Sequence, residues 1–264
     1  MESGENMAEQ SATDAGVARD QLVERLFGAT IGALDLLHVW LGERLGLYQA
    51  LADSPASSAQ LAERAQINER YAREWLEQQA VAGLLAVDDA DDPAVRRFSI
   101  PPGHGEVFLD RDSLSYMTPL ALGVVGMAQA LPLVGQAFAT GSGVPYEAYG
   151  VDTRNFISRI NRPMFVNLLA SEWFPGVPGL IARLQANPPA RVADLGCGTG
   201  WSSISIARGF PNAIVSGLDL DEASIDEARK NAVEAGVADR VTFEVRNAAD
   251  PRLAESFDLV CAFE

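Results

Sequence analysis

The sequence predicts an α/β fold in which a parallel sheet, wound with crossover helices, follows a mostly helical region. From Ala190 onward, short apolar runs alternate with helical segments at strand–helix–strand spacing, which is typical of a parallel sheet. Before that point, apolar residues recur mainly at helical spacing. The 264 residues and 48% hydrophobic content are enough for one large domain or two smaller ones.

The amino-terminal part is predicted to be a disordered tail over residues 1–19, followed by helices. The tail has no basic region followed by an apolar core, so it does not predict a secretory signal. From Asp20 to Asp53 the apolar residues follow a helical period, and we expect two helices that break near Gly42. An apolar helical surface at one end of a chain often pairs with a second copy, so these helices predict a homodimer.

Residues 57–83 predict a helix-turn-helix within a winged-helix domain over residues 20–110. Ser57 or Ser58 can cap a short first helix, residues 67–68 form the turn, and a longer second helix ends at Gly83. The segment DDADDPAVRRFSIPP then supplies the hairpin wing, with Phe98 and Ile100 on its returning strand. We expect this domain to serve dimerisation or to cover a pocket.

The charges of this region argue against nucleic acid as a partner. The second helix presents a mixture of both signs, at Glu69, Arg70, Arg73, Glu74 and Glu77, and the wing opens with four aspartates. The whole chain has a formal net charge of -16, whereas binding to a phosphate backbone requires clustered Lys and Arg.

Residues 111–188 are predicted to form a helical linker that lines a pocket. Residues 113–146 carry no Asp, Glu, Lys or Arg and are long enough to span a bilayer. Several helix breakers and amides interrupt them, namely Pro119, Gly123, Gly126, Gln129, Pro132, Gly135 and Gln136. No cluster of basic residues flanks the segment to orient an insertion. We therefore expect buried helices around an apolar pocket, with no membrane span.

The stretch VADLGCGTGW, residues 192–201, places a glycine loop directly behind the first strand. Its glycines run G-x-G-x-G, whereas the dinucleotide-binding fingerprint requires its third glycine where this chain has Trp201. The strand ends in Asp194, which would be poorly placed beside a pyrophosphate and well placed near a ligand's ammonium group. Ligands of such sheets bind at the carboxyl ends of the strands.

These residues resemble the first motif of the class I S-adenosylmethionine-dependent methyltransferases, which is an apolar strand, an acidic residue and then G-x-G-x-G. The next strand ends in Asp219, where that family keeps an acid for the two ribose hydroxyls, and one carboxylate can accept both hydrogen bonds. The third-strand segment ends in Arg246, Asn247 and Ala248 where the family most often has Gly-Asp-Ala. Asn247 departs from that pattern, but its amide oxygen can accept a hydrogen bond from the adenine amino group.

The resemblance implies a Rossmann-like methyltransferase sheet over residues 189–264 and S-adenosyl-L-methionine as the cofactor. The glycines would let the backbone lie against the methionine part of the cofactor, and the helix that follows would favour its carboxylate. The cofactor-binding residues that the resemblance implies are Asp194, Leu195, Gly196, Cys197, Gly198, Gly200, Asp219, Leu220, Asn247 and Ala248. Cys197 is interpreted as a tolerated small loop residue rather than a nucleophile.

The family's sheet has seven strands, and this chain reaches about four, so we expect the sheet to be incomplete. No catalytic base can be named, since the segments expected to carry it lie beyond residue 264. The layout resembles bacterial small-molecule methyltransferases, and the uncharged linker favours a hydrophobic acceptor; the choice among O-, N- and C-methylation stays open. The two cysteines, Cys197 and Cys261, form no metal-knuckle or redox spacing and fit a cytoplasmic setting, and two isolated histidines predict no metal site.

Two other functions stay open. The first is a winged-helix transcription regulator that uses the second domain to sense a cofactor. The second is a catalytically inactive protein that dimerises through residues 20–53.

Overall fold

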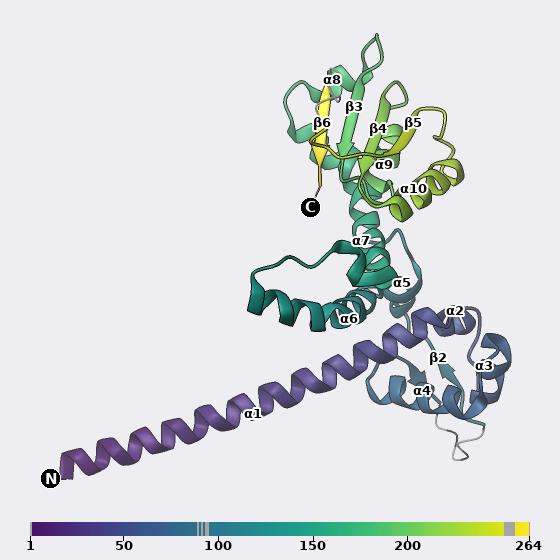
Figure 1. Cartoon of the computed structure of the whole chain (residues 1–264). Helices are drawn as coiled ribbons and strands as arrows, with labels where there is room; N and C mark the ends of the chain where they lie inside the picture. Colours follow the sequence, from purple (N-terminus) through teal and green to yellow (C-terminus); the bar gives the residue numbers. More distant parts are fainter. Residues whose placement is uncertain (1, 89, 91, 93–94, 251–256, 264) are drawn as a thin grey trace. The chain divides into compact units, whose positions relative to one another are not determined.

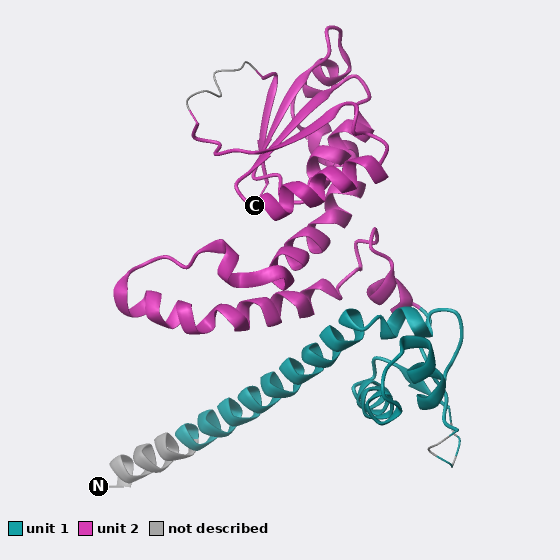
Figure 2. Ribbon diagram, turned by 45° about the vertical axis from the view of Figure 1, so that its right-hand side comes forward, with its two compact units in different colours: residues 1–102 teal, residues 103–264 magenta. Residues whose placement is uncertain are grey.

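The computed structural model describes residues 2–88, 90, 92, 95–250 and 257–263, with side chains from residue 14 onward. The chain divides into two compact units, residues 1–102 and 103–264 (Figure 2). The first contains helices and a two-stranded sheet, and the second contains helices and a four-stranded sheet.

Unit 1 begins with the long helix α1, Glu2–Arg44, which continues through residues 2–19, where we expected a disordered tail. No proline interrupts this stretch, and its Ala, Glu, Gln and Met residues have high helix propensity. The helix breaks at Gly46, which has a φ of 67°, before the short helix α2, Leu47–Leu51. The expected break near Gly42 was therefore wrong. Gly42 lies inside the helix, where Tyr48 and Trp75 pack so closely that a Cβ would lie 2.5 Å from Tyr48 Cε2.

The helix-turn-helix forms as predicted. Helix α3, Ser58–Ala65, starts with a capping box in which the Ser57 side chain accepts a hydrogen bond from Gln60 N. Helix α4, Glu69–Val81, is capped by Asn68. The wing is a short antiparallel pair, β1, Ala86–Val87, with β2, Phe98–Ser99, so Ile100 lies just outside its strand.

Unit 2 starts with a series of helices. They are α5, His104–Leu109; α6, Pro119–Thr140; α7, Gly150–Met164; and α8, Leu180–Gln185; with one-turn 3-10 helices η1, Tyr146–Tyr149, and η3, Phe174–Gly176, and a π-helix η2, Phe165–Trp173. One face of α6 packs on α7, where Gly126 approaches Thr153 so closely that no Cβ would fit.

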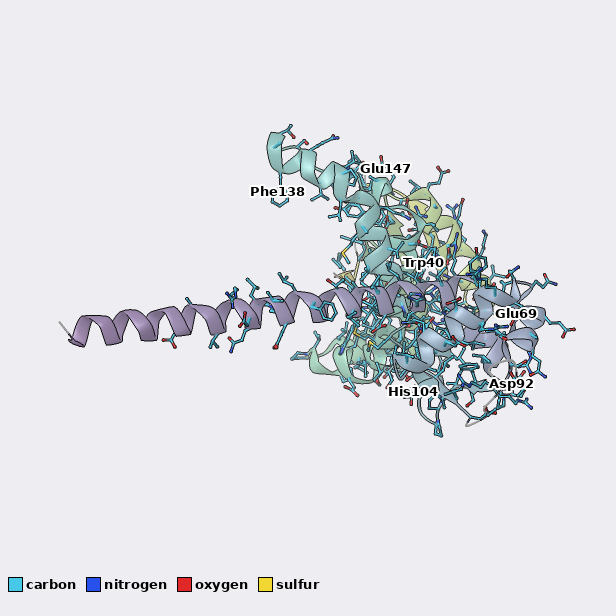
Figure 3. The ribbon with its side chains drawn as sticks, turned by 90° about the horizontal axis from the view of Figure 1, so that it is seen from below. Trp40, Glu69, Asp92, His104, Phe138 and Glu147 are labelled. Carbon is cyan, nitrogen blue, oxygen red and sulfur yellow. The ribbon has the colours of Figure 1, made fainter. Side chains whose placement is uncertain are left out.

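The exposure of α6 differs from the predicted buried helices. Only 28% of its most apolar 18-residue window is buried, and Leu131 and Phe138 are 60% and 89% exposed. Figure 3 shows Phe138 at the end of the helix, directed away from it. Among the described residues, α6 alone is long and apolar enough to cross a bilayer, a test that core helices of soluble proteins also pass.

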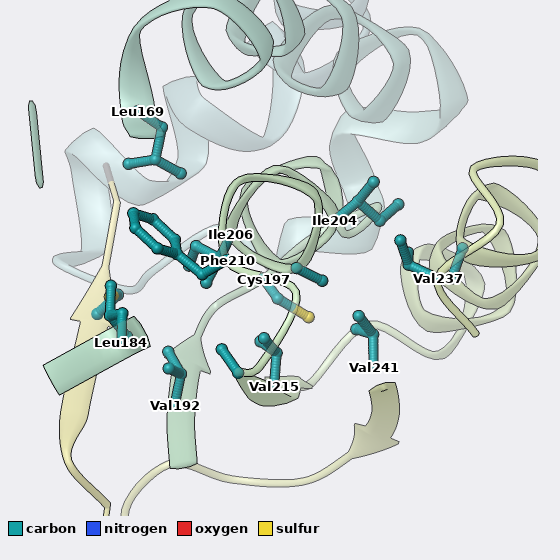
Figure 4. Close-up of a cluster of buried hydrophobic side chains, with 14 of the residues drawn as sticks. Leu169, Leu184, Val192, Cys197, Ile204, Ile206, Phe210, Val215, Val237 and Val241 are labelled. Carbon is teal, nitrogen blue, oxygen red and sulfur yellow. The ribbon is translucent and has the colours of Figure 1, made fainter. Parts of the chain in front are cut away.

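The sheet of unit 2 confirms the predicted parallel α/β fold (Figure 1). Its strands are β3, Arg191–Leu195; β4, Ile214–Asp219; β5, Val241–Val245; and β6, Leu259–Ala262. They are all parallel and lie in the order β5-β4-β3-β6. The crossover helices are α9, Trp201–Gly209, and α10, Glu222–Glu234. Val192, Ile206 and Phe210 contribute to the buried core between strands and helices, which Figure 4 shows.

Candidate functional site

The glycine loop follows β3 and is bound to the neighbouring strand. Gly196 N and Cys197 N both donate hydrogen bonds to Leu218 O, at 2.8 and 3.1 Å. Gly196 and Gly198 have φ values of 69° and 53°, which favour glycine. A Cβ at either position would meet no protein atom within 4 Å, because both residues border a cavity. The two glycines therefore leave open space where side chains would project.

Gly200, which we predicted to contact the cofactor, also meets a packing requirement. Its φ of 84° also favours glycine, but an added Cβ would lie 2.6 Å from Phe243 Cζ and 2.9 Å from Ala228 Cβ. The absence of a side chain here lets α9 begin against β5 and α10. The third glycine of the motif is thus explained by packing between protein elements.

Asp219, at the end of β4, faces the glycine loop. Its Oδ2 accepts a hydrogen bond from Gly198 N at 2.8 Å, and its Oδ1 accepts one from Asp221 N at 2.9 Å. A carboxylate has about four acceptor positions. The two backbone bonds therefore leave each oxygen able to accept a further hydrogen bond from a ligand.

Asp194 lies beneath the loop rather than on the cavity wall. The side chain is 1% exposed, and its Oδ2 accepts hydrogen bonds from Ser202 Oγ and Ser203 Oγ at 2.6 and 2.5 Å. Its Oδ1 is buried and has no hydrogen-bond partner among the described residues. Burial raises the pKa of Asp194, since desolvation penalises its charged form. An unpartnered buried oxygen of this kind would be stabilised by a nearby cation.

Helix α7 forms the opposite wall of the cavity and is joined to the loop region by two polar contacts. Arg154 forms a bidentate ion pair with Asp221, with nitrogen–oxygen distances of 2.7 and 3.2 Å. Ser158 Oγ lies 2.6 Å from Thr199 Oγ1 in the glycine loop. Asp221 also caps α10 through Ser224 N, as its position in the sequence indicates. Although burial acts to raise the pKa of Asp221, the hydrogen bonds from Arg154 and Ser224 lower it overall.

The sequence analysis did not single out these residues of α7. A signal was present, because five residues of the cavity wall recur at helical spacing: Arg154, Ile157, Ser158, Asn161 and Phe165. The pattern alone could not indicate that this face is directed toward a glycine loop some forty residues further along the chain.

The cavity between α7 and the loop has a volume of about 70 Å³ and opens to solvent. Besides the α7 face, it is lined by Tyr146, the loop residues 196–199, Trp201, Ser202, Ser224 and Phe263. Tyr146 is half-exposed, and burial followed by the charge of Asp221 raises its pKa. An aromatic group borders one end, where Phe165 lies 5.2 Å from Phe263 and 6.2 Å from Trp173 between ring centroids. Phe156, in contrast, packs on Gly123 inside the helical layer.

The remaining predicted residues lie around the same strand ends. Cys197 lines the cavity, but burial raises the pKa of its thiol, which does not suit a nucleophile. Leu195 is half-buried at the end of β3, and Leu220, after β4, is 69% exposed. Asn247 and Ala248 are exposed in a turn after β5, where Asn247 Oδ1 accepts a hydrogen bond from Ala249 N at 2.8 Å. The structure does not bring these two into the cavity wall.

Comparison with known families matches both parts of the chain. Residues 192–264 match the model of a methyltransferase domain, and residues 32–111 match the Rv2258c-like winged HTH domain. The ubiquinone biosynthesis O-methyltransferase of Hahella chejuensis is 43% identical over 87 residues, which are 32% of this chain and 34% of that protein. Matches to such curated relatives span only about a quarter to a third of their length.

Solved structures share the fold over most of this chain. The mitomycin 7-O-methyltransferase MmcR superposes with a TM-score of 0.62 at 18% identity, covering 93% of this chain and 71% of that one. Human N-acetylserotonin methyltransferase in complex with SAM superposes with a TM-score of 0.56 at 18% identity, covering 92% of this chain and 70% of that one. At these identities the likeness establishes the fold, in which a helical amino-terminal region precedes a Rossmann-like sheet.

Proposed function

We propose that this chain, which joins a winged-helix domain to a class I methyltransferase domain, binds S-adenosyl-L-methionine and transfers its methyl group to a small hydrophobic acceptor. The observation that carries the proposal is the open space at Gly196 and Gly198 beside the Asp219 carboxylate. A cofactor that needs close approach to backbone and an acceptor for a vicinal diol fits this arrangement.

The residues around the cavity fit the parts of that cofactor. Asp219 can accept hydrogen bonds from both ribose hydroxyls, because each of its oxygens now accepts one backbone N–H. Gly196 and Gly198 leave room for the methionine portion, and the amino end of α9 favours its carboxylate. The buried Oδ1 of Asp194 would be stabilised by the ammonium group. We keep Leu195, Cys197, Leu220, Asn247 and Ala248 as proposed cofactor contacts, with Leu220, Asn247 and Ala248 on the adenine side.

When bound, the cofactor supplies a sulfonium methyl group for in-line displacement at carbon. The chain itself contributes alignment and exclusion of water. Phe165, Phe263 and Trp173 form an aromatic border that supports a hydrophobic acceptor. Relatives such as the Amycolatopsis mediterranei 27-O-demethylrifamycin SV methyltransferase, 37% identical over 86 residues, carry names of small-molecule enzymes. We leave the acceptor atom and the base unassigned.

The alternative functions are not favoured. In the helix-turn-helix, Arg73 pairs with Glu69 at 2.6 Å, and Glu69 also accepts a hydrogen bond from Ser58, so this arginine is already engaged within the domain. We propose a homodimer formed through the amino-terminal helices and a cytoplasmic setting.

Calorimetry with S-adenosylhomocysteine tests the cofactor assignment on the 264-residue chain. Asp219→Ala should weaken binding about ten-fold to a hundred-fold, because two charge-assisted hydrogen bonds are lost. Asp239→Ala is the matched control, since that carboxylate is 74% exposed and should bind as the parent does. Absence of heat with the parent chain, or equal affinity in both variants, would refute the ribose assignment.

A further inference from the structure

Helix α1 carries a long apolar surface that its own unit leaves exposed. Its contacts with α2 and α4 lie toward its carboxyl end, and Figure 2 shows the preceding teal part of the helix clear of the other elements of that unit. Large apolar side chains of α1, and that of Leu45 directly after it, are 38–69% exposed; those of α1 are Val17, Leu22, Val23, Leu26, Phe27, Ile31, Leu34, Leu37 and Leu41. Since helices derive most of their stability from packing of an apolar face, this surface needs a partner.

The spacing of these residues indicates the kind of partner. Val23, Phe27, Thr30, Leu34, Leu37 and Leu41 follow one another at alternating intervals of four and three residues. This is the heptad spacing of a coiled-coil seam, in which a second helix packs lengthwise. The seam is distinct from the α1 face that meets its own unit, where Val39 is buried and Gly42 contacts Tyr48 and Trp75.

We propose that α1 pairs with α1 of a second copy of this chain in an antiparallel coiled coil. In the register that places seam residues opposite one another, Val23 faces the partner's Leu41, Phe27 faces the partner's Leu37, and Thr30 faces the partner's Leu34. The two-fold axis makes each of these contacts occur twice. The inference goes beyond methyl transfer and does not depend on it.

Charge favours the antiparallel direction. The same register continues the seam to Asp20, which then faces the partner's Arg44, so an ion pair closes each end. In a parallel pair, Asp20 would face the partner's Asp20 and Arg44 the partner's Arg44, and like charges would repel.

A groove in unit 1 provides a second, independent reason. It has a volume of about 350 Å³ and is lined mainly by apolar side chains, including Leu41, Leu45, Tyr71 and Trp75. It is continuous with the seam, because Leu41 of α1 and Leu45 directly after the helix belong to the exposed apolar surface as well. In the antiparallel pair, the partner's Val23 lies opposite Leu41. From there the partner's helix continues toward its amino terminus over this groove. A parallel pair would direct the partner's amino-terminal segment away from it.

Charge reversal tests the register. Light scattering after size exclusion, at a series of concentrations, should show a dimer for the parent chain. Asp20→Arg should raise the dimer dissociation constant about ten-fold or more, since it places two arginines opposite one another. The double variant Asp20→Arg with Arg44→Asp should restore dimerisation to near the parent value. A monomeric parent chain, or a double variant no better than Asp20→Arg alone, would overturn the proposal.

Disulfide trapping tests the direction without altering charge. Val23 and Leu41 are 61% and 38% exposed, so cysteine is tolerated at both, and the native Cys197 and Cys261 are buried. An oxidised equimolar mixture of Val23→Cys and Leu41→Cys chains should yield a covalent dimer on a non-reducing gel, whereas each variant alone should stay uncrosslinked. Efficient crosslinking of Val23→Cys with itself would establish the parallel arrangement and contradict the proposal, and so would no crosslinking in the mixture.

Discussion

Asp219 Oδ2 accepts a hydrogen bond from Gly198 N at 2.8 Å, which connects the end of β4 to the middle of the glycine loop. This bond holds a carboxylate beside an unobstructed stretch of backbone that lines the cavity. The shape of the loop and the position of the acid are therefore set together, and perturbing either should affect cofactor binding.

Gly198→Ala should abolish detectable binding of S-adenosylhomocysteine, because its methyl group would project into the cavity from a residue with a φ of 53°. Gly236→Ala is the matched control: its φ is 70°, and its Cβ also meets no atom, but it lies outside the cavity wall. Both variants should lose about 1–2 kcal/mol of stability from the left-handed backbone. Calorimetry and thermal unfolding separate the two effects, and equal affinities would contradict the cofactor site.

Asp194→Asn should stabilise the ligand-free chain increasingly as pH rises. Burial raises the pKa of Asp194 in the folded state. Its stabilising contribution is therefore complete below the unfolded value of about 3.9 and is lost as pH rises through the folded pKa. The variant has no such loss, so its melting temperature should exceed that of the parent by more at pH 8 than at pH 4. If the difference in melting temperature between the variant and the parent is the same at pH 4 and pH 8, the buried carboxyl does not ionise as proposed. The control is Asp239→Asn, a substitution on the surface.

Arg154→Gln should destabilise the chain at neutral pH, by about 1–2 kcal/mol for the lost charge-assisted bonds. The folded-state pKa of Asp221 is lowered, so this stabilisation is present above about pH 3.9 and is lost as pH falls through the folded pKa. Denaturant unfolding should show the difference from the parent shrinking toward pH 3. Arg19→Gln, whose ion pair with Asp20 is more than half exposed, should change stability little at any pH.

Gly42→Ala should destabilise unit 1 by about 1–3 kcal/mol, because a Cβ would lie 2.7 Å from Trp75 Cζ2 and 2.5 Å from Tyr48 Cε2. Gly32→Ala, in the same helix with no atom within 4 Å, should instead stabilise it by about 0.5–1 kcal/mol. Chemical denaturation followed by tryptophan fluorescence measures both changes. Similar effects at the two positions would mean that close packing does not explain the interior glycine.

Local signals predicted much of this fold. The caps at Ser57 and Asp221 were readable because each is a short polar side chain directly before a helical pattern. The parallel sheet was readable because its strands are short apolar runs at regular spacing. Asp219 was also found from its position at a strand end.

What the sequence could not predict depends on contacts between distant residues. Gly42 and Gly46 are only one turn apart, and two structural facts distinguish them: Gly42 packs against Tyr48 and Trp75, whereas Gly46 has the left-handed backbone at which the helix breaks. The packing of Gly200 against Phe243 and Ala228 was not readable either, because both residues lie far along the chain. The exposure of α6 was likewise invisible, since apolar composition gives no information on which neighbours cover a helix.

The Ser158–Thr199 contact spans 41 residues and the Arg154–Asp221 ion pair spans 67, so half of the cavity is built from chain that precedes residue 192. A graft or minimal fragment cut at the border of the matched methyltransferase family would discard that half. Engineers who wish to transplant this pocket should take the chain from Gly103 onward, treating the helices before the sheet as part of the binding module rather than as a connector.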